Sequence, residues 1–231
     1  MLIAALDSTA VTASAAIAEI NDGKLGTFAL FTVKNKLTHS EILLPLLENA
    51  LTQYGAKIGD VDLFAVSAGP GSFTGVRIGA ATVKGLAFAE NKPCVAVSPL
   101  EAMARTIGRG YACPVMDARR DQFYTALFKD GVRITEDSAL SAEEIKKLIA
   151  DLPEVVICGD GRDKFLSYCE GMGNLFPASD AMSDQNALSV ALCGFDAFAK
   201  GSAVSPESLQ PVYLRMPQAE RERLEREKSG K

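Results

Sequence analysis

The sequence predicts an α/β protein built from two similar lobes, each with a sheet flanked by helices. Two observations lead to this fold class. Short apolar runs of strand length alternate with longer segments in which apolar residues recur at the helical period. The order strand, aspartate-containing turn, strand, turn, strand occurs between residues 2 and 33 and again between residues 112 and 134. We therefore expect an N-terminal lobe over 1–107, a shortened C-terminal lobe over 108–217 and a charged tail over 218–231.

The composition is that of a globular protein with a proper core, since 48% of the 231 residues are hydrophobic and 23% are charged. The formal net charge of -5 argues against a broad electropositive surface, so any RNA should be held mainly by another subunit. Five cysteines without a C-x-x-C pair are typical of reduced core residues in a cytosolic protein. No signal peptide is recognised, and no apolar run approaches the ~20 residues that span a bilayer. We expect a cytoplasmic protein that does not bind membranes.

The first three strands are expected at residues 2–6, 11–20 and 25–33, and Asn21-Asp22-Gly23 has the turn chemistry to join the last two. The segment Asp7-Ser8-Thr9 forms the first turn and places a carboxylate and two hydroxyls beyond the strand ends. These groups either face a ligand or form a solvated Asx turn, and the sequence leaves both alternatives open.

A helix is expected to begin after Thr38 and to end at Gly55. Thr38 and Glu41 have the spacing of a capping box, and apolar residues recur behind them at the helical period. Pro45 lies inside this helix and predicts a kink, because proline removes one intrahelical donor. One face of the helix is free for the sheet or for a partner: Ile42, Leu46 and Ala50.

The most distinctive stretch is Gly69–Gly79, with the sequence Gly-Pro-Gly-Ser-Phe-Thr-Gly-Val-Arg-Ile-Gly. It follows a buried-strand pattern at 61–66 and leads into a helix expected over 76–90. A glycine-rich bend at a helix N-terminus can present several N–H donors to an anion. The stretch is not a P-loop, because Val76 and Arg77 stand where Lys and Ser or Thr are needed. An anion site and a tight turn that brings the helix close to the sheet are the two alternatives, and the tight turn is favoured.

The helix that follows carries two lines of small residues, which let two surfaces approach closely. One line contains Gly75, Gly79 and Val83, and the other contains Ala81, Gly85 and Ala89. The helix either packs on the sheet or forms an interface with a second subunit. Glycines inside a helix cost about 1 kcal/mol each relative to alanine, so a close contact is expected to offset them.

The second half repeats the first in outline, with a meander, helices and a further strand. Ser98 and Ser141 are the expected caps of two helices. Strands are expected at 94–97, 112–116, 122–128, 132–134 and 155–158, and the last helices near 162–169 and 185–199. Asp117 follows the strand at 112–116, at the position that Asp7 holds in the first half.

Two halves of this kind resemble the actin-like ATPase and sugar kinase superfamily, with its ribonuclease H-like fold and a nucleotide between the lobes. Within that superfamily, five stretches over nearly the whole chain resemble the TsaB (YeaZ) family. The most specific is the glycine-rich stretch with the two residues before it. The others are Ala4-Ala5-Leu6-Asp7-Ser8-Thr9, Thr38-His39-Ser40-Glu41, Met116-Asp117-Ala118-Arg119 and Pro211-Val212-Tyr213-Leu214-Arg215.

The resemblance implies a non-catalytic partner of the enzyme TsaD in forming N6-threonylcarbamoyladenosine in tRNA. It further implies a complex that includes the ATPase TsaE and an indirect contact with tRNA. We also expect a homodimer when the chain is alone, because a two-fold contact can use the patch otherwise presented to a related subunit. The helices at 39–54 and 75–90 would pack on TsaD, with interface residues His39, Ile42, Leu46, Ala50, Phe73, Val76, Gly79 and Val83. The residues that would face a nucleotide or anion are Asp7, Ser8, Thr9, Gly71, Ser72, Thr74 and Asp117.

Two departures from active relatives argue against catalysis by this chain, for which we expect no catalytic residue and no metal. His39 is the only histidine, and Leu43 stands where the second histidine of the metal pair in TsaD relatives would lie. Arg119 and Arg120 follow Asp117 in place of a glycine-containing phosphate turn, and their side chains could form ion pairs with Asp117 or neighbouring acids and fill the cleft. We expect no cofactor on the chain alone, and ATP only at low affinity or at the complex interface.

Two other functions compete with this one. An independent ATPase or small-molecule kinase would use Asp7 and Asp117, with Gly159-Asp160-Gly161 near an adenosine. A metallopeptidase would agree with the glycoprotease label that chains of this family have carried, but it would require metal ligands that the sequence lacks.

Overall fold

The expected N-terminal meander opens a five-stranded mixed sheet in the computed structural model, which describes residues 1–35 and 38–215. The strand order is β3-β2-β1-β4-β5, and the central strand β1 pairs antiparallel with β2 and parallel with β4. The five strands are β1 (Leu2–Asp7), β2 (Thr12–Asn21), β3 (Lys24–Lys34), β4 (Leu63–Ser67) and β5 (Cys94–Val97).

The turn between β2 and β3 forms as its sequence predicts. Asp22 and Gly23 have φ angles of 51° and 75°, and Asn21 pairs with Lys24 across them. Two left-handed residues in a two-residue connection match the twist of a β-hairpin, which is why Asp-Gly is favoured there.

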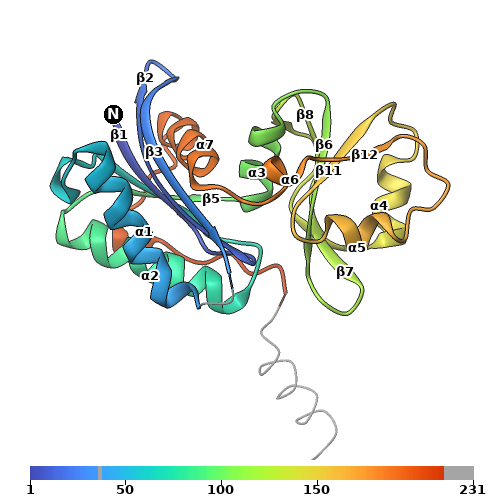
Figure 1. Ribbon diagram of the computed structural model, residues 1–231, viewed down its shortest axis with the longest axis horizontal. Helices are drawn as coiled ribbons and strands as arrows, with labels where there is room; N and C mark the ends of the chain where they lie inside the picture. Colours follow the sequence, from blue (N-terminus) through green and yellow to red (C-terminus); the bar gives the residue numbers. More distant parts are fainter. Residues whose placement is uncertain (36–37, 216–231) are drawn as a thin grey trace, which may run out of the picture.

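Helices cover both faces of this first sheet (Figure 1). On one face lie α1 (His39–Tyr54) and α2 (Phe73–Ala89), and on the other lies α7 (Ala187–Ala199). Because side chains alternate along a strand, Leu6 of β1 packs toward α1 and α2 while Ile3 packs toward α7. The sheet is therefore buried on both faces, which explains its nearly continuous apolar strands.

The predicted boundaries of α1 are confirmed. The Thr38 amide donates a 3.4 Å hydrogen bond to the Glu41 carboxylate, and Gly55 ends the helix with a left-handed φ of 85°. Pro45 lies within the helix. The kink expected there stays a prediction.

The second lobe contains a seven-stranded sheet whose main path has the strand order β10-β7-β6-β11-β12, with β8 and β9 off this path. The strand expected over 122–128 is divided, because β6 pairs with β7 near one end and with β8 near the other. Neither β10 nor β12 was predicted from the sequence. The strands are β6 (Tyr111–Asp117), β7 (Gln122–Thr125), β8 (Phe128–Lys129), β9 (Val132–Arg133), β10 (Ser138–Ser141), β11 (Val155–Cys158) and β12 (Leu175–Pro177).

Short helices surround this second sheet, and one helix joins the lobes. The expected helix near 162–169 is shorter than predicted and ends at Leu166. Ser98 and Ser141 cap α3 and α4 as expected, each accepting a hydrogen bond from a backbone amide of the first turn. The helices are α3 (Pro99–Ile107) between the lobes, and α4 (Ala142–Ile149), α5 (Arg162–Leu166) and α6 (Asp180–Ser183) in the second lobe.

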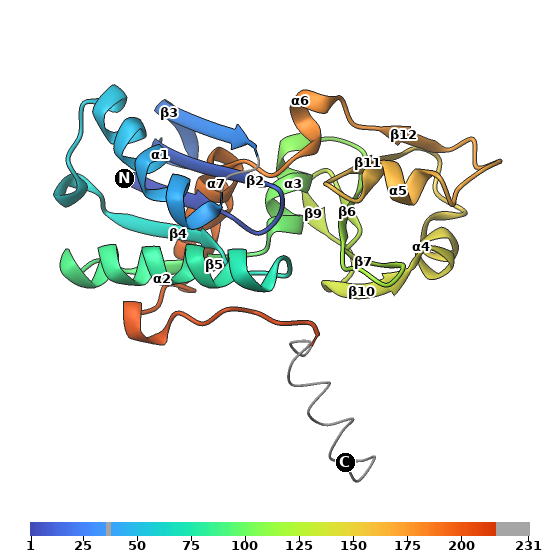
Figure 2. The ribbon, with the colours of Figure 1, turned by 60° about the horizontal axis from the view of Figure 1, so that its bottom comes forward.

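The last part of the described chain returns to the first lobe. Although α7 lies within the segment expected to form the second lobe, it packs on the first sheet, where Gly194 approaches Ala65 so closely that a Cβ atom would lie 2.7 Å away. The segment after α7 then runs beneath α2 (Figure 2). The division of the chain at residue 107 therefore stays a prediction, and the expected tail at 218–231 lies outside the described residues.

All five cysteines are buried and free, as their sequence context predicts. Burial raises the pKa of the Cys113 thiol to about 11 and that of the Cys193 thiol to about 12, so both stay protonated near neutral pH. Over 1–35 and 38–215, no helix combines the length and the apolar character that crossing a membrane requires.

Candidate functional site

The turn between β1 and β2 lies directly against the N-terminus of α2. The Ser72 amide donates a 2.6 Å hydrogen bond to the Thr9 carbonyl, and the Ser8 hydroxyl donates a 2.9 Å hydrogen bond to the Gly75 carbonyl. The glycine-rich stretch therefore joins two parts of the first lobe that are far apart in sequence.

This contact is so close that only glycine fits at three positions. A Cβ atom at Gly71 would lie 2.5 Å from the Thr9 carbonyl oxygen, and one at Gly79 would lie 2.8 Å from the Ser8 hydroxyl. A Cβ atom at Gly75 would overlap the Ser8 carbonyl oxygen still more severely. The geometry favours the tight-turn interpretation, in which glycines bring a helix close to a sheet.

Hydrogen bonds within the protein already use several donors at the start of α2. Ser72 is the N-cap, and its hydroxyl accepts a 3.3 Å hydrogen bond from the Gly75 amide. The Ser72 amide is itself bonded to Thr9. An anion would find fewer free donors here than at an uncapped helix, and anion binding stays a prediction.

The Asp7 carboxylate is buried beneath this loop. It accepts hydrogen bonds from the Ser67 hydroxyl at 2.5 Å and from the Thr9 amide and hydroxyl at 2.8 Å each. Burial raises the pKa of Asp7, while these hydrogen bonds act in the opposite direction. Asp7 and Ser8 are both shielded from solvent and do not line the cleft between the lobes, which corrects the expectation that they face a ligand.

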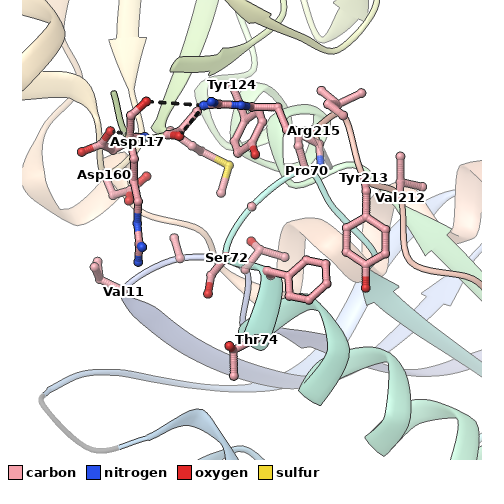
Figure 3. A pocket seen from close by; sticks show the side chains of 18 residues that line it. Val11, Pro70, Ser72, Thr74, Asp117, Tyr124, Asp160, Val212, Tyr213 and Arg215 are labelled. Carbon is pink, nitrogen blue, oxygen red and sulfur yellow. Dashed lines mark hydrogen bonds between the residues drawn. The ribbon is translucent and has the colours of Figure 1, made fainter. Parts of the chain in front are cut away.

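A cleft of about 480 Å³ lies between the two lobes, and Figure 3 shows side chains from both reaching its walls. Thr9, Gly71, Ser72 and Thr74 line it from the first lobe. Asp117 lines it from the second lobe. The structure therefore brings these five expected residues together, and their contact with a nucleotide or anion stays a prediction.

Asp117 is paired with a residue that the sequence did not indicate. The Lys164 ammonium lies 3.3 Å from its Oδ1, and the Arg119 amide donates a 2.8 Å hydrogen bond to the same oxygen. The expected ion pair with the Arg119 or Arg120 side chain is therefore not formed. The turn instead contains three consecutive non-glycine residues with left-handed φ angles: Arg119 at 62°, Arg120 at 54° and Asp121 at 54°.

Asp160 lines the same cleft and is the titratable group there whose pKa departs most from its ordinary value. It is largely shielded from solvent, and its Oδ1 has no hydrogen-bond partner among the described residues. Burial is the main cause that raises the pKa of Asp160 to about 6. The sequence placed Asp160 only in the alternative of an ATPase or kinase, near an adenosine.

His39 ties α1 to the β1–β2 turn. Its Nε2 lies 2.6 Å from the Ala10 carbonyl oxygen, and its ring lies next to Gly75, where a Cβ atom would be 3.4 Å from Cδ2. His39 is half-buried and makes this contact within the first lobe, and its place in a partner interface stays a prediction. Over 1–35 and 38–215, no three His, Cys, Asp or Glu residues are grouped so that they could hold a metal.

The predicted interface line on α1 and α2 faces inward. Five of its residues are buried in the core of the first lobe, because this line is the one that packs on the sheet. Ile42 packs at the edge of that core, and Phe73 is half-buried against Tyr213. The prediction that these side chains meet a partner is wrong for the five buried residues: Leu46, Ala50, Val76, Gly79 and Val83.

The other line of small residues on α2 faces solvent. Ala81 and Gly85 are exposed, and a Cβ atom at Gly85 would meet no atom within 4 Å. Phe88 continues the line and is 67% exposed, while Leu44 on the neighbouring α1 is 42% exposed. We call this surface the outer face of α1 and α2, and define it by Leu44, Thr74, Ala81, Gly85 and Phe88.

The two lobes, the cleft and the glycine-rich helix start define a protein of the actin-like ATPase and sugar kinase fold class. The family model described as "TsaD: tRNA N6-adenosine threonylcarbamoyltransferase" matches residues 34–152, just over half of the chain. The chain belongs to this family, and full-length relatives place it in the TsaB (YeaZ) branch that its motifs predict.

Two of these relatives are each called "tRNA threonylcarbamoyladenosine biosynthesis protein TsaB". The protein of Escherichia coli (strain K12) is 29% identical over 227 residues, which cover 93% of this chain and 95% of that one. The protein of Bacillus subtilis (strain 168) is 29% identical over 238 residues, which cover 99% and 100%. The solved structure of YeaZ from Pseudomonas aeruginosa has a TM-score of 0.73 and 27% identity, covering 92% of this chain and 99% of that one.

Proposed function

We propose that this chain is a non-catalytic subunit that binds and activates TsaD in tRNA N6-threonylcarbamoyladenosine biosynthesis. The names of the full-length relatives support the process, and the family model named for TsaD supports a common origin with the proposed partner. The complex also contains TsaE, and this subunit contacts tRNA only indirectly. In the absence of TsaD, the same surface supports a homodimer, because a two-fold contact can use a patch otherwise presented to a related subunit.

The observation that carries the proposal is the outer face of α1 and α2. A line of residues without bulk on α2, with the exposed Phe88 one turn from Gly85, lets a partner helix approach closely and gain apolar contact. Gly85 shows this most directly, since it has no packing role in the isolated chain yet leaves α2 without a side chain there.

A non-catalytic role agrees with the contacts of the two residues that an active relative would use for catalysis. Asp7 is buried and fully engaged by Ser67 and Thr9, so it cannot reach a substrate without rearrangement. His39 is the only histidine and is directed to the Ala10 carbonyl. Both groups support the first lobe rather than a reaction.

The test uses Gly85→Glu, which places a charge on the outer face without straining the isolated chain. Binding to TsaD should weaken about tenfold or more, because the carboxylate would be desolvated without a partner. Gly173→Glu is the matched control, since Gly173 is exposed in the second lobe and also has open space around it. Binding to purified TsaD is measured by calorimetry. Modification of tRNA is measured in a reaction that also contains TsaE. Wild-type binding and modification by Gly85→Glu would overturn the proposal.

The cleft favours one second candidate, an ATPase or small-molecule kinase. It is large enough for a ligand, and Asp117 and Asp160 line it. Calorimetry of the isolated chain with ATP and Mg²⁺ separates the candidates. Micromolar binding with turnover would favour the enzyme, while binding that requires TsaD would place ATP at the complex interface.

A further inference from the structure

The segment after α7 reaches the underside of α2 and is anchored there. It passes through the short 3-10 helix η2 (Pro206–Ser208), after which the Leu209 side chain is buried. The Lys84 ammonium on α2 donates hydrogen bonds of 3.1 Å to the carbonyls of Glu207 and Leu209. The chain then runs along α2 toward the second lobe (Figure 2). We call residues 209–215 the strap.

The middle of the strap is held on the first lobe by its backbone. The Val212 amide donates a 2.7 Å hydrogen bond to the Ala68 carbonyl. The Val212 carbonyl lies so close to Gly69 that a Cβ atom at Gly69 would overlap its oxygen. Gly69 has a φ of 115°, so glycine is needed there both for the backbone conformation and for this approach.

Tyr213 connects the strap to the side chains of α2. Its ring centroid lies 4.8 Å from that of Phe73, and its hydroxyl accepts a 3.0 Å hydrogen bond from Arg77 Nε. The Arg77 guanidinium carbon lies 3.8 Å from the Phe73 ring centroid, within the range of a cation–π contact. The three side chains form one stack on the exposed side of α2.

Arg215 carries the strap across to the second lobe. Its Nη1 donates hydrogen bonds of 2.7 Å to the Ala118 carbonyl and 3.4 Å to the Arg119 carbonyl, drawn as dashed lines in Figure 3. Both carbonyls belong to the β6–β7 turn, which forms the second-lobe wall of the cleft. Hydrogen bonds from a charged donor are stronger than those between neutral groups.

We propose that the strap is a latch that holds the two lobes at their observed separation, with Arg215 as its catch. Lobes joined in one chain move relative to each other unless contacts fix them. Other contacts between the lobes include the Lys34–Asp184 ion pair at 2.8 Å and the hydrogen bond from Ser98 to Asp137 at 2.6 Å. Leu100 and Met103 of α3 also pack in one apolar cluster with Met116 of β6. None of these contacts holds the Ala118 and Arg119 carbonyls, so release of Arg215 frees the β6–β7 turn while the lobes remain connected.

The latch also gives the start of α2 a connection to the cleft. A molecule that binds Arg77 removes the hydrogen-bond donor of the Tyr213 hydroxyl. Tyr213 is only two residues before Arg215, so this change reaches the contact between the strap and the second lobe. Closure of the cleft and contacts at this end of α2 are then linked. The latch itself is a property of the isolated chain and does not depend on the proposed function.

Single-molecule energy transfer on the full chain tests the latch. Dyes are attached at Gln53→Cys on α1 and Lys147→Cys on α4, both exposed, while the five native thiols are buried. The labelled chain without further substitution should show one narrow distribution of transfer efficiency. Arg215→Ala should add a population with lower or broader transfer efficiency. Hydrogen exchange at the Val212 amide should accelerate about tenfold or more, in keeping with loss of a charge-assisted hydrogen bond.

Two matched variants complete the experiment. Arg120→Ala removes an exposed arginine from the same turn and should behave as wild type. The Arg120 guanidinium makes no hydrogen bond with any residue of 1–35 or 38–215. Arg215→Lys keeps a charged donor and should restore part of the narrow population. Circular dichroism confirms that each variant is folded. If Arg215→Ala matches Arg120→Ala in both measurements, the latch is overturned.

Discussion

Gly75 and Gly85 both lie on α2, but they meet different surroundings. A Cβ atom at Gly75 would overlap the Ser8 carbonyl oxygen, which is backbone and cannot move aside, whereas one at Gly85 would extend into open space. Gly75→Ala is therefore expected to lower the free energy of unfolding by more than about 4 kcal/mol, the range of severe core disruption. Gly85→Ala is expected to raise it by up to about 1 kcal/mol.

Urea unfolding of the two variants and the wild type measures this difference. The prediction concerns opposite signs at two glycines of one helix, so a general effect of adding a methyl group cannot produce it. A stabilised or unchanged Gly75→Ala would show that the β1–β2 turn does not hold the start of α2.

Asp160 should make stability depend on pH. Its pKa is raised from an ordinary value of 3.8 to about 6, so the folded chain holds a proton there that the unfolded chain releases. The free energy of unfolding therefore falls as the pH rises through this window. Asp160→Asn cannot ionise, and its stability relative to wild type should rise by roughly 3 kcal/mol between acidic and neutral pH.

Asp163→Asn is the control for this prediction, because Arg162 lowers the pKa of Asp163. That carboxylate contributes stability above its unfolded pKa, and the contribution is lost as the pH falls, which is the opposite slope. Chemical unfolding at several pH values compares the three proteins. Parallel pH curves for wild type and Asp160→Asn would contradict the assignment.

Local chemistry could be predicted at the residue scale, but the direction of a helix face could not. The caps at Ser98 and Ser141 and the turn at Asp22-Gly23 depend on neighbouring residues alone, and all formed as predicted. The inward line of α2 was assigned to a partner because both lines of that helix consist of small residues. Periodicity identifies two faces, and only the sheet beneath decides which one is buried.

At the scale of elements, the edge strand β3 and the outer face of α2 are expected to affect self-association in different ways. β3 is the outer strand of its sheet, with charge only at its two lysine ends, and Phe28 on it is 47% exposed. Exposed apolar edge strands favour unwanted pairing. Phe28→Lys should therefore raise solubility and leave a specific homodimer intact, whereas Gly85→Glu should abolish the homodimer.

Light scattering over a range of concentrations, together with solubility measurements, distinguishes the two effects. The Phe28 side chain is 47% exposed and Gly85 has open space around it, so neither substitution should lower the unfolding midpoint by much. Loss of the homodimer in Phe28→Lys with its retention in Gly85→Glu would transfer the dimer contact from α2 to the sheet edge.

The long elements were predictable, but two short strands were not. The strands at the N-terminus and the helices α1 and α2 have enough residues for a clear period. β10 has four residues and β12 has three, and they exist because β7 and β11 offer them hydrogen-bonding partners. Such pairing depends on residues that are distant in sequence, so the amino-acid composition of a short segment does not predict it.

At the scale of the whole molecule, α7 crosses back to the first sheet, and no local signal indicates this. Its apolar residues predict a buried helix but not which sheet it covers. In the structure, Val190 and Ala191 complete the second face of the first sheet. A lobe defined by residues 1–107 alone therefore lacks half of its core cover, and this has a direct consequence for fragments of the chain.

We expect a fragment of residues 1–107 to unfold without cooperativity, because the sheet face formed by Ile3, Ala5 and Val95 would be exposed to water. Joining it to residues 186–215 should restore folding. The ends are close, since the side-chain amide of Asn186 donates a 3.0 Å hydrogen bond from Nδ2 to the Thr106 hydroxyl, so a short glycine linker suffices. Thermal unfolding followed by circular dichroism compares the two chains. A cooperative transition in the 1–107 fragment equal to that of the joined chain would show that α7 is dispensable for the first lobe.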